Sequence, residues 1–135
     1  MPSAKIRFPL PLLPRYLVLA FALSTVIFVE ESKADAKKGE ELYGRCLACH
    51  ALEQDRVGPR HCGLLGRKAG SVPGFEYSEA MKRSGLTWDA RTLDRFLADP
   101  MKVVPNTTMT YAGIADPRER ADLIAYLRTI PCPKP

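Results

Sequence analysis

The chain has 135 residues, of which 46% are hydrophobic and 26% charged, and its formal net charge is +5 at pH 7. This composition excludes an intrinsically disordered chain, which would have few apolar residues and a high net charge. No sequence period repeats, so collagen-like and solenoid architectures are excluded as well. The chain has a single long apolar run and is too short for a large multidomain enzyme, so a polytopic membrane protein and such an enzyme are both excluded.

The amino-terminal segment has the pattern of a secretory signal. Three basic residues precede an apolar run over residues 17–29, which is shorter than the roughly 20 residues that a membrane-spanning helix needs. Small residues follow, and cleavage after Ala34 or after Ala36 fits the pattern. We expect residues 1–34 to be removed on export to the periplasm, leaving one domain over residues 35–135. An uncleaved membrane anchor is the alternative.

The expected mature region is mildly basic. It carries sixteen basic and thirteen acidic side chains, a net charge of +3. Because the two signs are interspersed, the pattern argues against nucleic acid binding. It is compatible with docking to an acidic protein partner.

The first predicted helix covers residues 36–48. Leu42, Tyr43 and Leu47 have the spacing of one helical face. Gly39 lies on that face one turn before Tyr43, although glycine costs about 1 kcal/mol of helix propensity relative to alanine. We interpret Gly39 as a point of close approach for another helix.

Two shorter helices are predicted in the middle of the chain. One covers residues 78–85 with Ser78 as its N-cap, and the next covers residues 87–98 with Thr87 as its N-cap. Asp99-Pro100 is expected to end the second one, because a residue before proline disfavours the helical conformation.

The last predicted helix covers residues 117–130. Asp116 is its expected N-cap, and Glu119 is expected to close a capping box. Glycine- and proline-rich loops are predicted over residues 51–72 and 101–112. The chain is thus predicted to be all-α, with three to four helices and no strands. Long loops in so small a domain indicate that they wrap around a cofactor.

The sequence Cys46-Leu47-Ala48-Cys49-His50 is the attachment pattern of a c-type haem. Two thiols three positions apart on a helical turn can each form a thioether with a vinyl group of the porphyrin, and the next residue supplies an imidazole to the iron. A redox dithiol is disfavoured because it needs a strand before the motif. A zinc site needs two more ligands at matched spacing, and the nearby His61 and Cys62 are adjacent. We therefore expect one covalent haem c.

His50 is expected to be one axial ligand of the iron. The candidates for the other face are His61, Met81, Met101 and Met109. Met109 is favoured because it lies in a loop that starts with a proline and joins two helices. Met101 is its rival, and Met81 is expected to fill the core, the usual role of methionine. Ligation by histidine and methionine raises the reduction potential and closes the iron to small molecules.

These features resemble class I cytochrome c, in the branch of bacterial cytochrome c2 and mitochondrial cytochrome c. The likeness runs from about Lys37 to Ile130. Besides the haem motif it rests on residues 58–59 (GP), 63–70 (GLLGRKAG), 73–78 (PGFEYS), 87–89 (TWD), 105–109 (PNTTM) and 122–127 (DLIAYL). It implies a small cytochrome c fold wrapped around the haem. It also implies that the first and last helices cross, with Gly39 and Tyr43 against Leu123 and Tyr126.

The resemblance implies roles for further residues. Met109 falls at the position of the axial methionine, and Pro59 at the position whose carbonyl orients the proximal imidazole. The positions that bond or neutralise the haem propionates are held by Arg67, Tyr77, Trp88 and Thr107. For Tyr77 and Trp88, ordinary core aromatics are the alternative.

The chain departs from the family pattern in three places. Asn106 stands where glycine is usual, and asparagine tolerates the left-handed backbone that this turn needs. Phe96 replaces a tyrosine that commonly bonds the methionine sulfur. Met101 and Thr108 replace lysines that usually ring the exposed haem edge, so the edge is expected to be less basic.

Cys62 and Cys132 remain after the haem takes two cysteines. Disulfides are permitted in an exported protein. In the family fold the segment that holds Cys62 lies near the end of the last helix, so the resemblance implies a bridge from Cys62 to Cys132. Two unpaired thiols are the alternative.

The sequence predicts a monomeric one-electron carrier and no enzyme. The expected partners are redox proteins, such as a membrane respiratory complex, an oxidase or a periplasmic dehydrogenase, which would dock transiently at the exposed haem edge. A dedicated electron-accepting subunit of one dehydrogenase is the first alternative. A haem peroxidase or gas-binding protein is the second, with His61 as the only candidate distal residue.

Overall fold

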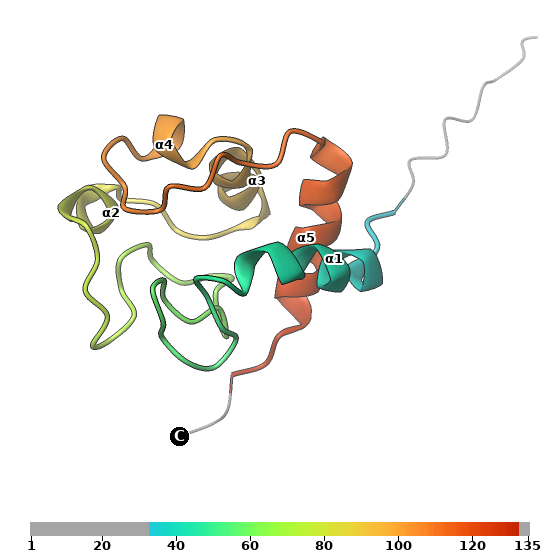
Figure 1. Ribbon diagram of the computed structural model, residues 1–135, viewed down its shortest axis with the longest axis horizontal. Helices are drawn as coiled ribbons and strands as arrows, with labels where there is room; N and C mark the ends of the chain where they lie inside the picture. Colours follow the sequence, from blue (N-terminus) through green and yellow to red (C-terminus); the bar gives the residue numbers. More distant parts are fainter. Residues whose placement is uncertain (1–32, 133–135) are drawn as a thin grey trace, which may run out of the picture. The chain divides into compact units, whose positions relative to one another are not determined.

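The computed structural model describes residues 33–132 (Figure 1), so almost all of the predicted signal lies outside the described part. Within it are five α-helices and one 3-10 helix: α1 (Ala36–Tyr43), η1 (Gly44–Cys46), α2 (Glu79–Arg83), α3 (Ala90–Ala98), α4 (Pro100–Val103) and α5 (Pro117–Thr129). These residues contain no β-strand, and their single isolated bridge pairs Lys68 with Thr87. The predicted all-α class is confirmed. Residues 33–132 contain no helix of the length and apolarity needed to cross a bilayer.

Helix α1 crosses α5, as Figure 1 shows, and Gly39 lies at the crossing. A Cβ atom on Gly39 would overlap the Asp122 carbonyl oxygen and would lie 2.8 Å from Cβ of Tyr126. Tyr43, one turn later, is buried, with its ring centroid 5.5 Å from that of Tyr126. Leu123 is fully enclosed at 1% exposure. The close approach expected at Gly39 is confirmed, because only a glycine lets the two backbones come this near.

The first helix is shorter than the predicted range of residues 36–48. The α-helical part ends at Tyr43, and η1 continues to Cys46. The carbonyl of Cys46 then accepts hydrogen bonds from the backbone N–H groups of Cys49 and His50, at 3.1 and 2.9 Å. The chain therefore turns here and does not continue as a helix.

The cap of α2 is confirmed, but the predicted cap of α3 is wrong. The Ser78 hydroxyl accepts from the N–H of Met81 at 3.2 Å. For α3 the N-cap is Asp89 and not Thr87: the Asp89 carboxylate accepts from the N–H of Thr92 at 2.7 Å, and the Thr92 hydroxyl accepts from the N–H of Asp89 at 2.8 Å. This reciprocal pair satisfies two helix-end donors, which a threonine at position 87 does not reach.

Helix α4 was not predicted, because Asp99-Pro100 indicates the end of a helix. It does end α3, but Asp99 also caps α4 by accepting from the N–H of Lys102 at 3.1 Å, and Pro100 occupies the first helical turn. Proline is well suited to that position, where its missing N–H has no intrahelical partner.

Helix α5 begins as predicted, with Asp116 accepting from the N–H of Arg118 at 2.7 Å. The predicted capping box is wrong, however. The Glu119 carboxylate instead accepts two hydrogen bonds from the guanidinium of Arg45, at 2.8 and 3.3 Å. Glu119 thus links α5 to the segment before the haem motif.

Candidate functional site

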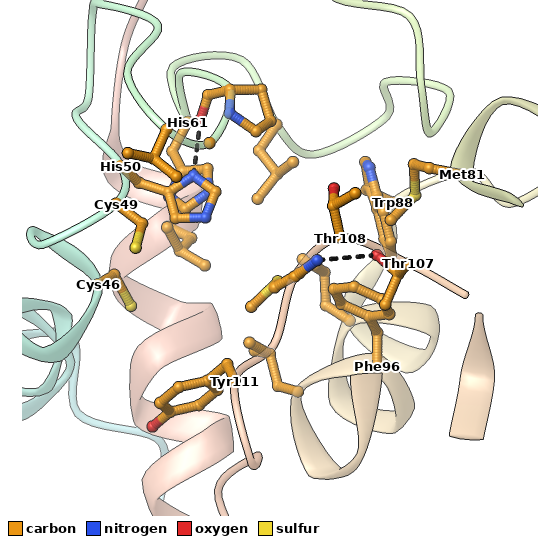
Figure 2. Close-up of a pocket in the computed structure, with 18 of the residues that line it drawn as sticks. Cys46, Cys49, His50, His61, Met81, Trp88, Phe96, Thr107, Thr108 and Tyr111 are labelled. Atoms are coloured by element: carbon orange, nitrogen blue, oxygen red, sulfur yellow. Dashed lines mark hydrogen bonds between the residues drawn. The ribbon is translucent and has the colours of Figure 1, made fainter. Parts of the chain in front are cut away.

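A cavity of about 420 Å³ lies between the haem-motif loop and the segments after α2. Its volume falls in the range of roughly 300–1,000 Å³ that is typical of ligand and cofactor sites. Figure 2 shows the labelled Cys46, Cys49 and His50 on one side of this space, with Trp88, Phe96 and Thr107 on the opposite side.

The 3-10 helix η1 and the turn that follows it place both motif cysteines beside the cavity. Cys46 is partly buried and Cys49 is exposed, and neither forms a disulfide within the described residues. Burial raises the pKa of the Cys46 thiol. Two thiols on one turn, both next to a single cavity, can attach one ligand at two points.

His50 lines the cavity and is buried, with 8% exposure. Its Nδ1 atom lies 2.8 Å from the carbonyl oxygen of Pro59, and Nδ1 must donate because a carbonyl only accepts (Figure 2). Among residues 33–132 no hydrogen bond engages its Nε2 atom. Burial lowers the pKa of His50, and the bond to Pro59 partly opposes this effect. The ring is thus a neutral imidazole whose free nitrogen can bind a metal.

His61 packs against His50, which the sequence did not predict. The two rings are stacked, with centroids 4.1 Å apart and an interplanar angle of 24°. A hydrogen bond of 3.1 Å joins Nδ1 of His61 to the hydroxyl of Tyr43. Burial, reinforced by His50 and Arg67, lowers the pKa of His61 to about 3. His61 therefore lies on the His50 side of the cavity and is wrong as a distal residue.

The opposite wall includes the loop before Met109. Thr107 is buried at 7% exposure, and its hydroxyl accepts from the N–H of Met109 at 3.3 Å, the second dashed line in Figure 2. Asn106 has a φ of 66°, so the expected tolerance of asparagine for this turn is confirmed. Met109 is partly buried and lines the cavity, together with Met81. Met101 is 53% exposed on α4 and lies outside the lining.

Three further predicted residues also line the cavity: Arg67, Tyr77 and Trp88. The guanidinium of Arg67 donates to the carbonyl oxygens of Cys62 and Arg60 at 2.8 and 2.9 Å, and burial lowers its pKa. Burial raises the pKa of Tyr77. Trp88 is 7% exposed, and its ring lies 5.0 Å from that of Phe96.

These residues fit a c-type haem. Two cysteine thiols and a histidine with an unbonded Nε2 stand beside one cavity, and its described lining contains just two charged side chains, Arg45 and Arg67. Gly58 is part of the fit, because a Cβ atom there would overlap the His50 ring. An apolar cavity with few polar groups suits a large, flat aromatic macrocycle.

Comparison with known proteins agrees with this geometry. The family model for cytochrome c matches residues 36–131. Cytochrome c2 from Rhodomicrobium vannielii is 49% identical over 98 residues, which cover 70% of this chain and 78% of that protein. Cytochrome c from Arabidopsis thaliana is 43% identical over 99 residues, covering 70% of this chain and 88% of that protein. The solved structure of cytochrome cH from Methylobacterium extorquens has a TM-score of 0.70 at 48% identity, covering 71% of this chain and 99% of that chain.

The chain belongs to the class I cytochrome c family. It is therefore an electron carrier and not an enzyme, and its partners are redox proteins. Its cofactor is one haem c, held covalently through Cys46 and Cys49. The predicted fold and cofactor are confirmed.

The two remaining cysteines of this cytochrome c are neighbours. Cys62 is buried at 4% exposure, and Cys132 is exposed. Burial and a hydrogen bond with Cys132 both raise the pKa of the Cys62 thiol. The structure shows them as two thiols, so their proximity is confirmed and the bond between them stays a prediction.

Proposed function

We propose that this cytochrome c is a periplasmic one-electron carrier with His50 and Met109 as axial ligands of its haem iron. The observation that carries the proposal is the pairing of His50, with its free Nε2, and the loop that holds Met109 on opposite sides of one cavity. When bound, the haem supplies the one-electron change between Fe(II) and Fe(III).

The other cavity residues support that chemistry from the protein side. Pro59 holds the tautomer and the orientation of His50, which makes Nε2 more basic. The residues assigned to the propionates are Arg67, Tyr77, Trp88 and Thr107. Burial of the haem in this largely apolar lining, together with its polar neighbours, sets the reduction potential.

The proposed export is supported by the pattern of the amino-terminal sequence and by the similarity to the relative named above as cytochrome c2. We place the signal at residues 1–34 and the cytochrome c domain at residues 35–135. The similarity to a bacterial cytochrome c2 supports a periplasmic site, and the described residues 33–132 belong to one compact unit. The expected partners are a membrane respiratory complex, an oxidase or a periplasmic dehydrogenase.

An absorption and ligand-binding experiment tests the ligand set. The purified exported protein should be coloured, should keep its pigment in acidified acetone, and should show the weak far-red band of a methionine–iron bond when oxidised. The reduced protein should not bind carbon monoxide at neutral pH, because both axial positions are taken. Ready binding of carbon monoxide contradicts the proposal.

A dedicated subunit of one dehydrogenase is the second candidate. It is supported by the scarcity of charge around the cavity, where Thr108 and Thr110 are exposed and uncharged. A carrier that serves one partner does not need long-range electrostatic steering. Co-purification of the protein with a single dehydrogenase from the native periplasm supports this alternative, and a freely soluble monomer contradicts it.

The proposed bridge between Cys62 and Cys132 completes the assignment of the cysteines. The two thiols would lose two protons and two electrons, which pass to a disulfide oxidant of the exporting compartment, and one S–S bond would form. It would tie the loop after His61 to the carboxyl end of α5 and leave the haem cysteines untouched.

A further inference from the structure

The Asp122 carboxylate is buried where α1 begins beside α5. Asp122 is 3% exposed, and its Oδ1 atom accepts a hydrogen bond of 2.7 Å from the backbone N–H of Asp35, 87 residues earlier in the chain. Nε of Arg118 lies 3.3 Å from the same oxygen. A buried carboxylate needs such partners, because an unpaired charge is costly away from water.

Asp35 is also the residue that starts α1. Its carboxylate accepts from the N–H groups of Lys37 and Lys38, at 2.9 and 3.4 Å, and its carbonyl accepts from the N–H of Gly39 at 3.0 Å. The backbone N–H and the side chain of one residue thus serve two purposes: the first binds α5, and the second caps α1.

The two candidate cleavage points have opposite effects on this arrangement. Cleavage after Ala36 would remove the cap, the bond to Asp122 and the first residue of α1. Cleavage after Ala34 would preserve all three and would change the Asp35 amide into an α-ammonium group. It would also remove Lys33, whose carbonyl accepts a 2.8 Å bond from Arg118, while the contact from Arg118 to Asp122 can remain.

We propose that the mature protein begins at Asp35 and that its α-amino group forms an ion pair with the buried carboxylate of Asp122. Asp122 is thereby a binding site for the new amino terminus, which processing creates. The hydrogen bond gains strength when its donor becomes charged, so maturation strengthens the contact between α1 and α5. This inference rests on the proposed export.

Amino-terminal sequencing and intact mass of the exported holoprotein test the cleavage point. The expected chain starts at Asp35. A chain that starts at Lys37 overturns this inference while export stands. A chain that still starts at Met1 overturns both the inference and the proposed cleavage of the signal, so the two failures can be told apart.

The ion pair is tested by inserting one alanine between Ala34 and Asp35, so that processing leaves a residue before Asp35. Asp122→Asn should reduce the folding equilibrium constant about tenfold more in the natural protein than in the insertion variant, because both proteins lose the contact with Arg118 but only the natural protein also loses the pair with the α-ammonium group. Glu40→Gln, at an exposed glutamate of α1, should have the same small effect in both proteins. Equal effects of Asp122→Asn in the two proteins overturn the ion pair.

A labelling measurement keeps the test valid if Asp122→Asn does not fold. In the folded natural protein, an amine-reactive reagent should modify the α-amino group of Asp35 at least about tenfold more slowly than that of the inserted alanine, because a paired ammonium must first lose its proton and its partner. Equal labelling rates overturn the proposal.

Discussion

His50 donates from Nδ1 to the carbonyl oxygen of Pro59 across 2.8 Å, and Gly58 leaves the space in which the ring lies. This bond determines the tautomer, because a proton on Nδ1 leaves the lone pair on Nε2. The short segment 58–59 therefore does two things for the proposed iron ligand: the proline orients it, and the glycine makes room for it.

Gly58→Ala should displace the His50 ring. The added Cβ would overlap Cε1 and would lie 2.6 Å from each ring nitrogen, and overpacking of this kind costs about 1–3 kcal/mol. The absorption spectrum and the free energy of unfolding of the holoprotein measure the effect. Gly44→Ala is the matched control, because its Cβ meets no atom within 4 Å and Gly44 has a φ of −48°. A wild-type spectrum and stability in Gly58→Ala would contradict the assignment.

Gly39→Ala separates helix propensity from helix packing. Propensity alone predicts that alanine stabilises α1 by about 1 kcal/mol. The structure predicts the opposite sign, a loss of about 1–3 kcal/mol, because the Cβ would overlap the Asp122 carbonyl oxygen, which is backbone and cannot turn away. Denaturant unfolding followed by haem absorbance gives the sign. A stabilised variant would show that α1 and α5 do not cross this closely.

Local patterns predicted much of the fold, including two helix starts, but failed at the starts of α3 and α4. The haem motif, Ser78 and Asp116 carry their signal within a few residues, and the structure agrees with each prediction. Asp99-Pro100 was predicted as a stop, yet it also starts α4, because proline favours a first helical turn as much as it disfavours a continuing one. Whether a helix resumes depends on the tertiary packing, where Pro100 is fully buried.

The candidate site was predictable where residues close together in the sequence carry the chemistry. Cys46, Cys49 and His50 follow from their spacing. The stack of His61 on His50 does not, because it requires the loop after Pro59 to fold back and bring Tyr43 within reach of the His61 ring. The hydrogen bond of Asp122 was equally unpredictable from local patterns, since its partner Asp35 is 87 residues away in the sequence.

His61→Leu should make the free energy of unfolding depend less on pH below pH 6.5. The pKa of His61 is about 3 in the folded protein and near 6.5 when unfolded, so below pH 6.5 the unfolded chain binds a proton that the folded chain refuses. Stability then falls on acidification by up to about 1.4 kcal/mol per pH unit. The pKa of Tyr43, raised to about 12 by burial, keeps that phenol neutral over this range. The free energy of unfolding of the wild-type protein and of His61→Leu, measured at pH 7, 6 and 5, tests this prediction. An equal loss of stability on acidification in the two proteins would contradict it.

Met109→Ala should leave one axial position of the haem iron without a protein ligand, whereas Met101→Ala should leave both positions occupied. Met109 lines the cavity, whereas Met101 lies outside the lining and is 53% exposed. We expect Met109→Ala to lose the far-red band, to bind carbon monoxide when reduced and to have a lower reduction potential, because the thioether favours Fe(II). Met101→Ala is the matched control and should retain the wild-type spectrum and potential. The reverse pattern would assign the ligand to Met101.

Cys132→Ser should destabilise the protein far more than an exposed substitution normally does. Cys132 is exposed, so without a bridge its replacement should change the free energy of unfolding by less than about 0.5 kcal/mol. With a bridge to Cys62 the loss should reach about 2–4 kcal/mol, because the cross-link no longer restricts the unfolded chain. Intact mass after alkylation of the unfolded, unreduced protein gives an independent reading: two added alkyl groups would mean that the neighbouring thiols of Cys62 and Cys132 never joined.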